Sequence, residues 1–304
     1  MQNLLTVEHL RVVFHREGKE IVPVRDVSFE VPPHGRVALV GESGCGKSLT
    51  ALSLAQLPPI DRASVSGKVA FAGDRTKLAY IFQNPGESLN PVMRIAEQIR
   101  EVLPRASRRE QNERIVELLA RTGLPDPRRA AHAYPCELSG GQQQRCMIAM
   151  ALAAAPELLI ADEPTTALDV TTQKQVLELI DSLAAETGMA VLLITHNLGL
   201  VAGRMDSVNV MYAGRIVESG PVVEVLAHPR HPYKRGLLAA VPALDAPRDT
   251  PLADIPGTVP PPDAWPSGCA FWPRCAAATD RCREVPPLET VDGRRRFACF
   301  NPAE

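Results

Sequence analysis

Apolar and polar residues alternate along two stretches near the start of the chain. The first runs from Leu4 to Phe14 and the second from Val24 to Val31. This alternation is typical of β-strands that have one buried face. It predicts two antiparallel strands ahead of a third strand, the short apolar run Val37–Val40.

Helical periodicity characterises the middle of the chain, from about Pro91 to Ala155. Helices are predicted there at residues 95–103 and 109–119. The Ala- and Leu-rich residues 49–57 predict a further helix directly after the third strand.

Strand-like apolar runs return at Leu158–Ala161 and Val191–Thr195, and helix and strand alternate after Asp162. The order of these elements predicts an α/β fold. Pro-rich composition from Val241 to Pro266 predicts extended backbone with few helices beyond that fold.

A phosphate-binding loop is predicted between the third strand and the helix after it. Residues 41–48 read Gly-Glu-Ser-Gly-Cys-Gly-Lys-Ser, and strand, Gly-rich turn and helix are the context that this motif needs. Glycines let the backbone curl with its N–H groups toward phosphate oxygens, and the helix N-terminus adds its positive dipole end. Lys47 is expected on the β- and γ-phosphates and Ser48 on Mg²⁺. The expected nucleotide contacts are Gly41, Ser43, Gly44, Cys45, Gly46, Lys47, Ser48 and Leu49.

Two adjacent carboxylates end the apolar run at residues 158–161. Asp162 is expected to hold Mg²⁺ through its hydration shell, and Glu163 to polarise the attacking water. Alone, an apolar run that ends in Asp-Glu is equally typical of a strand entering a solvated turn. Its position downstream of a phosphate-binding loop favours the metal site.

Composition narrows the classes of function. The 304 residues suit one large α/β domain with an appendage, and the net charge of −2 gives no field that attracts nucleic acid. The longest apolar stretch, Met147–Ala155, is too short to span a membrane, and the N-terminus lacks a signal-peptide pattern. We expect a cytosolic chain that binds no nucleic acid and meets a membrane only through partner subunits.

Further motifs surround the two phosphate elements. Ser139 in Leu-Ser-Gly-Gly-Gln, residues 138–142, is placed to cap the helix that follows, and Gly140 and Gly141 would let an anion approach its N-terminus. Gln83 follows an apolar run, Asp169 follows Ala-Leu, and His196 ends the run at residues 191–195. In this order and spacing the motifs resemble those of ABC transporter ATPases.

The resemblance implies a P-loop ATPase domain with a helical subdomain, and it implies roles for these motifs. Gln83 senses the γ-phosphate and Mg²⁺, His196 contacts the γ-phosphate, and Asp169 meets a partner ATPase. The segment Ser139, Gly140, Gly141 and Gln142 completes the ATP site of an opposing protomer. The resemblance therefore implies a head-to-tail pair of ATPase domains with two ATP molecules between them. For the adenine, Phe14 is the best-placed aromatic, with His15 as an equally placed rival.

The C-terminal part of the chain indicates which group of ABC transporter ATPases the chain resembles. Residues 211–220, His231-Pro232-Tyr233 and a cysteine-rich tail resemble the ATPase subunits of oligopeptide and dipeptide ABC importers over the whole chain. The resemblance implies a nucleotide-binding domain at 1–235, with its helical subdomain at about 88–155, and a small irregular Cys-rich domain at 236–304. Residues 46–53 look more like the first of the two paired ATPase subunits than the second.

The importer resemblance also implies partners and a place in the cell. They are a second, nonidentical ATPase subunit, two transmembrane permeases and, indirectly, an extracytoplasmic binding protein, with this chain on the cytoplasmic face of the bacterial inner membrane. Two departures stand out: Lys234 replaces the usual hydroxyl residue after His-Pro-Tyr, and the segment between Gly67 and Tyr80 is shorter than usual.

Four of the seven cysteines, Cys269, Cys275, Cys282 and Cys299, crowd into the last forty residues. Disulfides are disfavoured in the cytosol, so an iron–sulfur cluster, a zinc site and reduced thiols are the alternatives. The resemblance implies a [4Fe–4S] cluster with a structural role, because so small a segment needs a staple to fold. We expect this tail to be remote from the phosphate-binding loop, so that metal loss leaves ATP binding largely intact.

Other functions stay open on these residues. A non-transport ABC ATPase, such as an accessory subunit of carbon–phosphorus lyase, has similar motifs but would not explain the Cys-rich tail. A nucleotide-binding module without hydrolysis would not need Lys47, Asp162, Glu163 and His196 together. Short peptides, glutathione-like peptides, nickel chelates and some oligosaccharides are all possible cargo.

Overall fold

The computed structural model describes residues 2–57, 63–166, 168–240 and 254–303. The chain divides into two compact units. The first unit comprises Met1–Val31, Arg36–Ala70 and Ile194–Glu304, and the second comprises Pro32–Gly35 and Phe71–Leu193. The α/β fold is confirmed, whereas the domain boundary at residue 235 stays a prediction.

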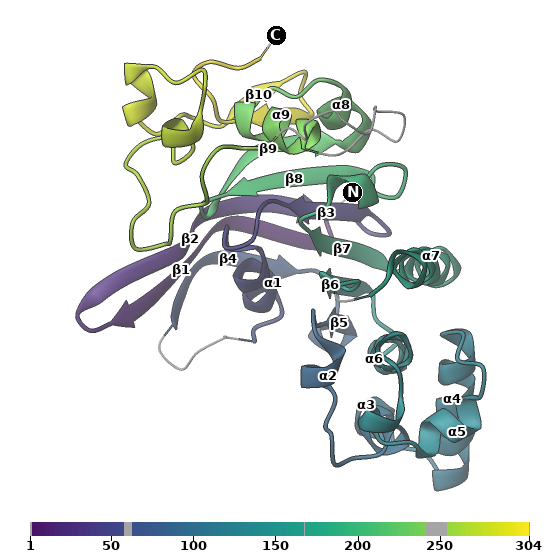
Figure 1. Ribbon diagram of the computed structural model, residues 1–304. Helices are drawn as coiled ribbons and strands as arrows, with labels where there is room; N and C mark the ends of the chain where they lie inside the picture. The colour runs from purple at the N-terminus through teal and green to yellow at the C-terminus, as the bar shows by residue number, and fades with distance from the viewer. Residues whose placement is uncertain (1, 58–62, 167, 241–253, 304) are drawn as a thin grey trace. The chain divides into compact units, whose positions relative to one another are not determined.

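A long antiparallel hairpin opens the first unit (Figure 1). Its strands are β1 (Leu5–Arg16) and β2 (Lys19–Val31), paired from Leu5 opposite Val31 to Arg16 opposite Lys19. Leu5, Val7, Leu10 and Val12 of β1 are buried, and the alternation shifts by one residue between Val7 and Leu10, where the pairing with β2 is irregular. The alternation along both strands is therefore the pattern of a sheet with one face on the core.

The other strands of the first unit continue from this hairpin in the order β4-β1-β2-β9-β8-β3. Their bounds are β3 (Arg36–Val40), β4 (Ala63–Phe71), β8 (Ser207–Tyr212) and β9 (Arg215–Pro221). Strand β3 pairs parallel with β8, and β8 pairs antiparallel with β9. Residues 37–40 of β3 are buried, as expected for a central strand.

The C-terminal tail joins this sheet through a short hairpin. Strand β11 (Arg295–Phe297) pairs with both β10 (Glu289–Val291) and β9. Among its described residues, the first unit has three helices, α1 (Lys47–Leu54), α8 (Val222–Ala227) and α9 (Pro232–Ala239). Single 3₁₀ turns lie at Leu198–Leu200, Trp272–Arg274 and Asp280–Arg283. Residues 254–266 contain no helix, which agrees with their Pro-rich composition.

The second unit combines a small parallel sheet with a group of helices. Its strands, in the order β7-β6-β5, are β5 (Leu78–Ile81), β6 (Leu158–Asp162) and β7 (Ala190–Thr195), whose last two residues belong to the first unit. Its helices are α2 (Pro85–Ser88), α3 (Ile95–Val102), α4 (Arg108–Arg121), α5 (Pro127–His132), α6 (Gly140–Ala153) and α7 (Val170–Thr187). Short 3₁₀ turns lie at Arg75–Lys77 and Pro135–Glu137.

Helices α3, α4 and α5 gather beside α6 in the second unit (Figure 1). Helices α3 and α4 begin and end within two residues of the segments expected from periodicity. A capping box fixes the start of α4, where Ser107 accepts from the Glu110 backbone and Glu110 accepts from the Ser107 backbone. Residues 88–155 thus contain helices α3 to α6, and the bounds of the helical subdomain stay a prediction.

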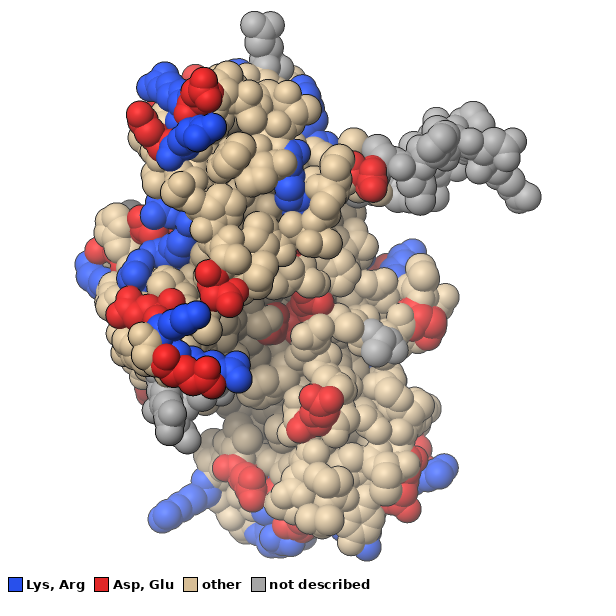
Figure 2. All heavy atoms as spheres, turned by 60° about the vertical axis from the view of Figure 1, so that its left-hand side comes forward, with Lys and Arg blue, Asp and Glu red and all other residues tan. Residues whose placement is uncertain are grey.

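Charges of both signs mix on the surface of the molecule. Figure 2 shows Lys and Arg side chains interspersed with Asp and Glu side chains on one face. Arginines of the helical group pair with nearby glutamates, as in Arg108–Glu97 and Arg109–Glu113. Such exposed pairs contribute little to stability. Within the described residues, no helix is both long enough and apolar enough to cross a membrane.

Candidate functional site

The phosphate-binding loop lies between β3 and α1, as the sequence predicts. Gly46, the residue before α1, has a φ of 103°, and a Cβ there would lie 2.6 Å from the Pro23 carbonyl oxygen. A Cβ on Gly41 would collide with the carbonyl oxygen of Met211. Only glycine fits these two positions without displacing backbone.

Lys47 is buried at the first position of α1. Its Nζ donates to the carbonyl oxygens of Gly41 at 2.8 Å and Glu42 at 3.1 Å, which holds the ammonium over the loop. Burial raises the pKa of the neighbouring Cys45 thiol to about 11, so this cysteine is a neutral packing group. The loop therefore presents one buried cation among backbone groups, an arrangement suited to an anion.

Arg274, a residue of the Cys-rich tail, binds the phosphate-binding loop through Glu42. The Arg274 guanidinium donates to both carboxylate oxygens of Glu42, at 2.9 and 3.1 Å. Arg274 is 6% exposed and Glu42 is 29% exposed. Hydrogen bonds to this carboxylate and to Tyr212 raise the pKa of Arg274, against the effect of its burial. A bidentate, partly buried pair of this kind fixes both geometry and charge.

Aromatic side chains extend the contact between tail and loop. The Tyr233 hydroxyl accepts from the Glu42 backbone N–H at 2.8 Å, and the Tyr212 hydroxyl accepts from Arg274 at 3.3 Å. Phe271 packs against both tyrosines with ring centroids 5.3 Å apart. The expectation that the tail is remote from the phosphate-binding loop is therefore wrong. A bridge across 232 positions of sequence brings them together.

We predict that Arg274→Met weakens ATP binding by about tenfold, because Glu42 then loses its tether and the loop spends less time in its binding conformation. Fluorescence titration with an ATP analogue on the purified chain measures the effect. Arg283→Met is the matched control, since Arg283 lies in the same tail but its side chain is 71% exposed. Equal affinities in the two variants would show that the bridge does not organise the loop.

In the second unit, Asp162 ends strand β6 and is 4% exposed. The Tyr80 hydroxyl donates to its Oδ2 at 2.9 Å from the neighbouring parallel strand β5. Burial and the Asp162 charge raise the pKa of Tyr80, which therefore stays a donor and fixes the carboxylate. Tyr80 was not predicted as a site residue, because the pairing of β5 with β6 that brings it to Asp162 cannot be inferred from local spacing.

Glu163, the next residue, adopts a left-handed backbone with a φ of 44°. Its Oε2 accepts from Thr166 Oγ1 at 3.1 Å and from Gln83 Nε2 at 3.3 Å. The structure thus brings together two residues that the sequence analysis selected separately, Gln83 and Glu163. A non-glycine residue held in this strained region is typical of functional sites.

Helix α6 begins with the predicted cap. Ser139 Oγ accepts from the Gln142 backbone N–H at 3.4 Å, and Gln142 Oε1 accepts from the Ser139 backbone N–H at 3.0 Å. A Cβ on Gly141 would lie 2.9 Å from the Thr172 methyl group, so glycine here permits close packing against α7. The capping role of Ser139 is confirmed.

Asp169 caps helix α7. It accepts from the backbone N–H of Thr172 at 3.0 Å and from the Thr172 hydroxyl at 2.6 Å. These hydrogen bonds lower the pKa of Asp169. The carboxylate is therefore held in a fixed orientation at the helix start.

The remaining nucleotide candidates lie in the first unit. His196 directly follows β7 and is exposed. Phe14 is half-buried in β1 opposite Ile21, and the exposed His15 lies 4.0 Å from Glu20. The choice of aromatic for the adenine stays a prediction.

The four tail cysteines share one region of the first unit. Burial and the charges of the other three thiols raise the pKa of Cys299 to about 11. Burial, with weaker effects of neighbouring thiols, also raises the pKa of Cys269 and Cys275. Cys282 Sγ accepts from the Thr279 backbone N–H at 3.5 Å and from Asn301 Nδ2 at 3.6 Å. Across the described ranges, no three His, Cys, Asp or Glu side chains form a group arranged to bind a metal.

Comparisons with known proteins agree with this geometry. The family model for ABC transporters matches residues 24–166, and that for the oligopeptide/dipeptide transporter C-terminal region matches residues 217–282. A putative peptide import ATP-binding protein of Brucella ovis is 48% identical, with 98% of this chain and 97% of the relative covered. The chain belongs to the ATP-binding subunits of oligopeptide/dipeptide ABC transporters. A second relative in this family, from Brucella abortus and also named a putative peptide import ATP-binding protein, is 44% identical over 97% of this chain and 94% of its own.

Solved structures of ABC transporter cassettes and components support the fold. A dimeric ATP-binding cassette in a post-hydrolysis state, bound to ADP and Pi, is 26% identical with a TM-score of 0.62. The match covers 72% of this chain and 98% of that one. A Clostridium perfringens ABC transporter component is 24% identical with a TM-score of 0.63, over 75% of this chain and 92% of its own, and shows likeness of fold. As a member of this family, the chain is an ATPase whose hydrolysis is coupled to transport.

Proposed function

We propose that this subunit hydrolyses ATP to power the import of short peptides across the cytoplasmic membrane, acting from its cytoplasmic face. The observation that carries the proposal is the presence of both transporter regions in one chain that is 48% identical, over nearly its whole length, to a relative named as a peptide import ATP-binding protein. The Arg274–Glu42 bridge supports it, because the region typical of peptide transporters holds the nucleotide loop directly.

The nucleotide chemistry is assigned to the residues selected from the sequence. Backbone N–H groups of residues 41–49 cradle the phosphates and Lys47 neutralises their charge. Ser48, Gln83 and Asp162 hold Mg²⁺, which neutralises charge on the transferring phosphoryl group when bound. Glu163 orients water, with Gln83 on the same carboxylate, and His196 contacts the γ-phosphate.

The active assembly contains a second, nonidentical ATPase subunit, two permeases and an extracytoplasmic binding protein. In this arrangement Ser139, Gly140, Gly141 and Gln142 meet the γ-phosphate on the partner's loop, and Asp169 lies at the junction of the two ATPases. The fixed starts of α6 and α7 support this, since capping leaves both helix ends preorganised.

A complex reconstituted from the chain and its partner subunits tests the proposal. ATP hydrolysis should rise severalfold when the binding protein is loaded with a tripeptide and stay basal with a trisaccharide. Stimulation by the trisaccharide alone would contradict peptide import while leaving the ATPase assignment intact.

The tail cysteines are proposed to hold a [4Fe–4S] cluster with a structural role. The proposal is supported by the chemistry of the residues: four thiols, the usual ligands of such a cluster, share one region, and N–H groups from Thr279 and Asn301 point at Cys282 Sγ. Hydrogen bonds to sulfur are among the factors that tune such clusters. Metal binding would require the four thiols to draw closer together.

We predict that Cys275→Ser in protein purified without oxygen releases the iron and exposes residues after Pro256 to proteolysis, because folding of the tail is linked to metal binding. ATP affinity should fall with it, since Arg274 is the adjacent residue. Elemental analysis measures the metal, and Cys136→Ser, a change at an exposed thiol outside the tail, is the control. About four irons with matching sulfide in the wild type supports the cluster; one zinc or no metal contradicts it.

A further inference from the structure

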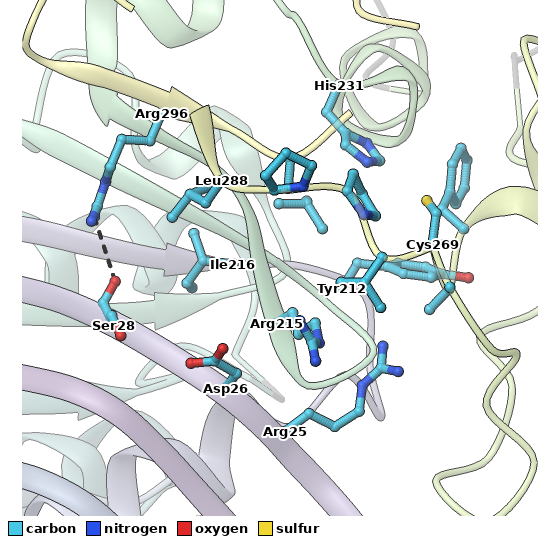
Figure 3. Close-up of a pocket in the computed structure, with 18 of the residues that line it drawn as sticks. Arg25, Asp26, Ser28, Tyr212, Arg215, Ile216, His231, Cys269, Leu288 and Arg296 are labelled. Carbon is cyan, nitrogen blue, oxygen red and sulfur yellow. Dashed lines mark hydrogen bonds between the residues drawn. The ribbon is translucent and has the colours of Figure 1, made fainter. Parts of the chain in front are cut away.

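A cavity of about 510 Å³ lies within the first unit, between its strands and the Cys-rich tail (Figure 3). Cavities that bind small molecules have volumes of about 300–1,000 Å³. One wall comes from β2 and β9, and the other from tail residues 268–271 and 285–288. Of the four tail cysteines only Cys269 borders it, and no residue of the phosphate-binding loop does.

Two guanidinium groups meet at one end of this cavity. Figure 3 shows Arg25 and Arg215 extending toward the same space. Arg25 Nε donates to the Ala213 carbonyl at 2.8 Å, and its guanidinium stacks 4.7 Å from the centre of the Trp265 ring. Arg215 Nε is buried and has no hydrogen-bond partner among the described residues. No described residue therefore holds the Arg215 guanidinium through this nitrogen.

Two carboxylates, Asp26 and Glu8, also line the cavity, and each has another side chain as its partner. Asp26 Oδ1 lies 3.0 Å from His9 Nδ1, and Glu8 pairs with Lys68 at 3.2 Å. Within the described ranges, neither Arg25 nor Arg215 forms an ion pair. Burial and the charge of Arg215 lower the pKa of Arg25 to about 10. Like charges brought together in a partly buried place favour the binding of an anion between them.

The rest of the cavity is largely apolar. Ile216 faces Leu288 across it in Figure 3, and Phe271 and Pro286 complete this part of the lining. The third arginine, Arg296, is already engaged by Ser219 Oγ at 3.2 Å and the Ser28 carbonyl at 3.4 Å. The cavity therefore has one cationic end, and the rest of its lining is largely apolar.

We propose that this cavity is a binding site for a small organic anion, a carboxylate or phosphate monoester that carries an apolar body. The anionic group binds between Arg25 and Arg215, where guanidinium groups can donate in pairs to two oxygens. The apolar body packs against Ile216, Phe271 and Leu288.

Calorimetric titration of the full chain tests the site with matched probes. Octanoate, octyl phosphate and octanamide have similar alkyl chains, but only octanoate and octyl phosphate carry a negative charge. At least one of the two anions should bind at least about tenfold more tightly than octanamide, because charged hydrogen bonds are about twice as strong as neutral ones. Whichever anion binds more tightly identifies the preferred headgroup.

Arg215→Gln should weaken binding of the preferred anion by about tenfold or more and leave octanamide unaffected. Arg11→Gln is the matched control, since Arg11 is an exposed residue of β1 that carries the same charge but does not line the cavity. Unchanged ATP affinity in both variants confirms that they fold. Equal binding of octanamide and both anions, no binding of either anion, or equal anion affinity in wild type and Arg215→Gln would overturn the proposal.

Discussion

Glu163→Gln should slow ATP hydrolysis by about a hundredfold to ten-thousandfold while ATP still binds, since a positioned general base contributes about that much. Glutamine keeps the shape of the side chain and can still meet Thr166 and Gln83, so the backbone at residue 163 need not change. Phosphate release under single-turnover conditions measures the chemical step, and ATP affinity is measured on the same sample.

The matched control for this change is Glu157→Gln, which removes one carboxylate just before the start of the same strand, β6. The control should keep the wild-type rate. Wild-type turnover in Glu163→Gln would remove Glu163 from the reaction, whereas loss of ATP binding in that variant would show a structural role instead.

Lys47→Ala should weaken ATP binding by about a hundredfold, because the phosphates lose the ammonium that the loop holds ready. Nζ is already fixed by the carbonyls of Gly41 and Glu42, so little ordering is needed when the nucleotide binds. The same titration should show wild-type affinity for Lys68→Ala, which removes an exposed lysine of β4.

Lys47→Met keeps the aliphatic stem of the buried lysine. It therefore serves as a second test of the lost charge in case the alanine variant misfolds. Both variants should show the same loss of affinity with an unchanged thermal unfolding midpoint. Wild-type ATP affinity in either variant would contradict the assignment of residues 41–48 as the phosphate site.

The features that could be predicted from the sequence are those that depend on residues close together in the chain. The glycines at 41 and 46, the cap at Ser139 and the alternation along β1 each act through residues within a few positions, so pattern and spacing expose them. The phosphate-binding loop and the helices of the second unit could therefore be placed from the chain alone.

Contacts between distant segments could not be predicted in this way. Arg274 is one of many arginines, and nothing near it in the sequence indicates that its partner is Glu42. Tyr80 meets Asp162 only because β5 and β6 pair in parallel, which fixes their register. Each of these partners depends on chain topology rather than on local spacing.

The surroundings of Lys234 could not be predicted from the sequence either. The sequence marked it as a departure from the family without indicating its surroundings. The structure buries it fully in α9, where no described residue accepts a hydrogen bond from Nζ. Burial lowers the pKa of Lys234 to about 8, and the buried carboxylate of Glu218 opposes that shift. The surroundings of Lys234 therefore depend on β9, a strand that ends thirteen positions earlier in the sequence.

Uptake of a labelled tripeptide into membrane vesicles tests the central claim most directly. The vesicles contain the permeases, with this chain, its partner ATPase and ATP enclosed in the lumen and the binding protein and tripeptide on the outer side. Import into the vesicle lumen should require ATP and should fall to background when this chain carries Glu163→Gln, and the Glu157→Gln control should import at the wild-type rate. Tripeptide uptake that continues unchanged with Glu163→Gln would contradict ATP-driven peptide import by this subunit.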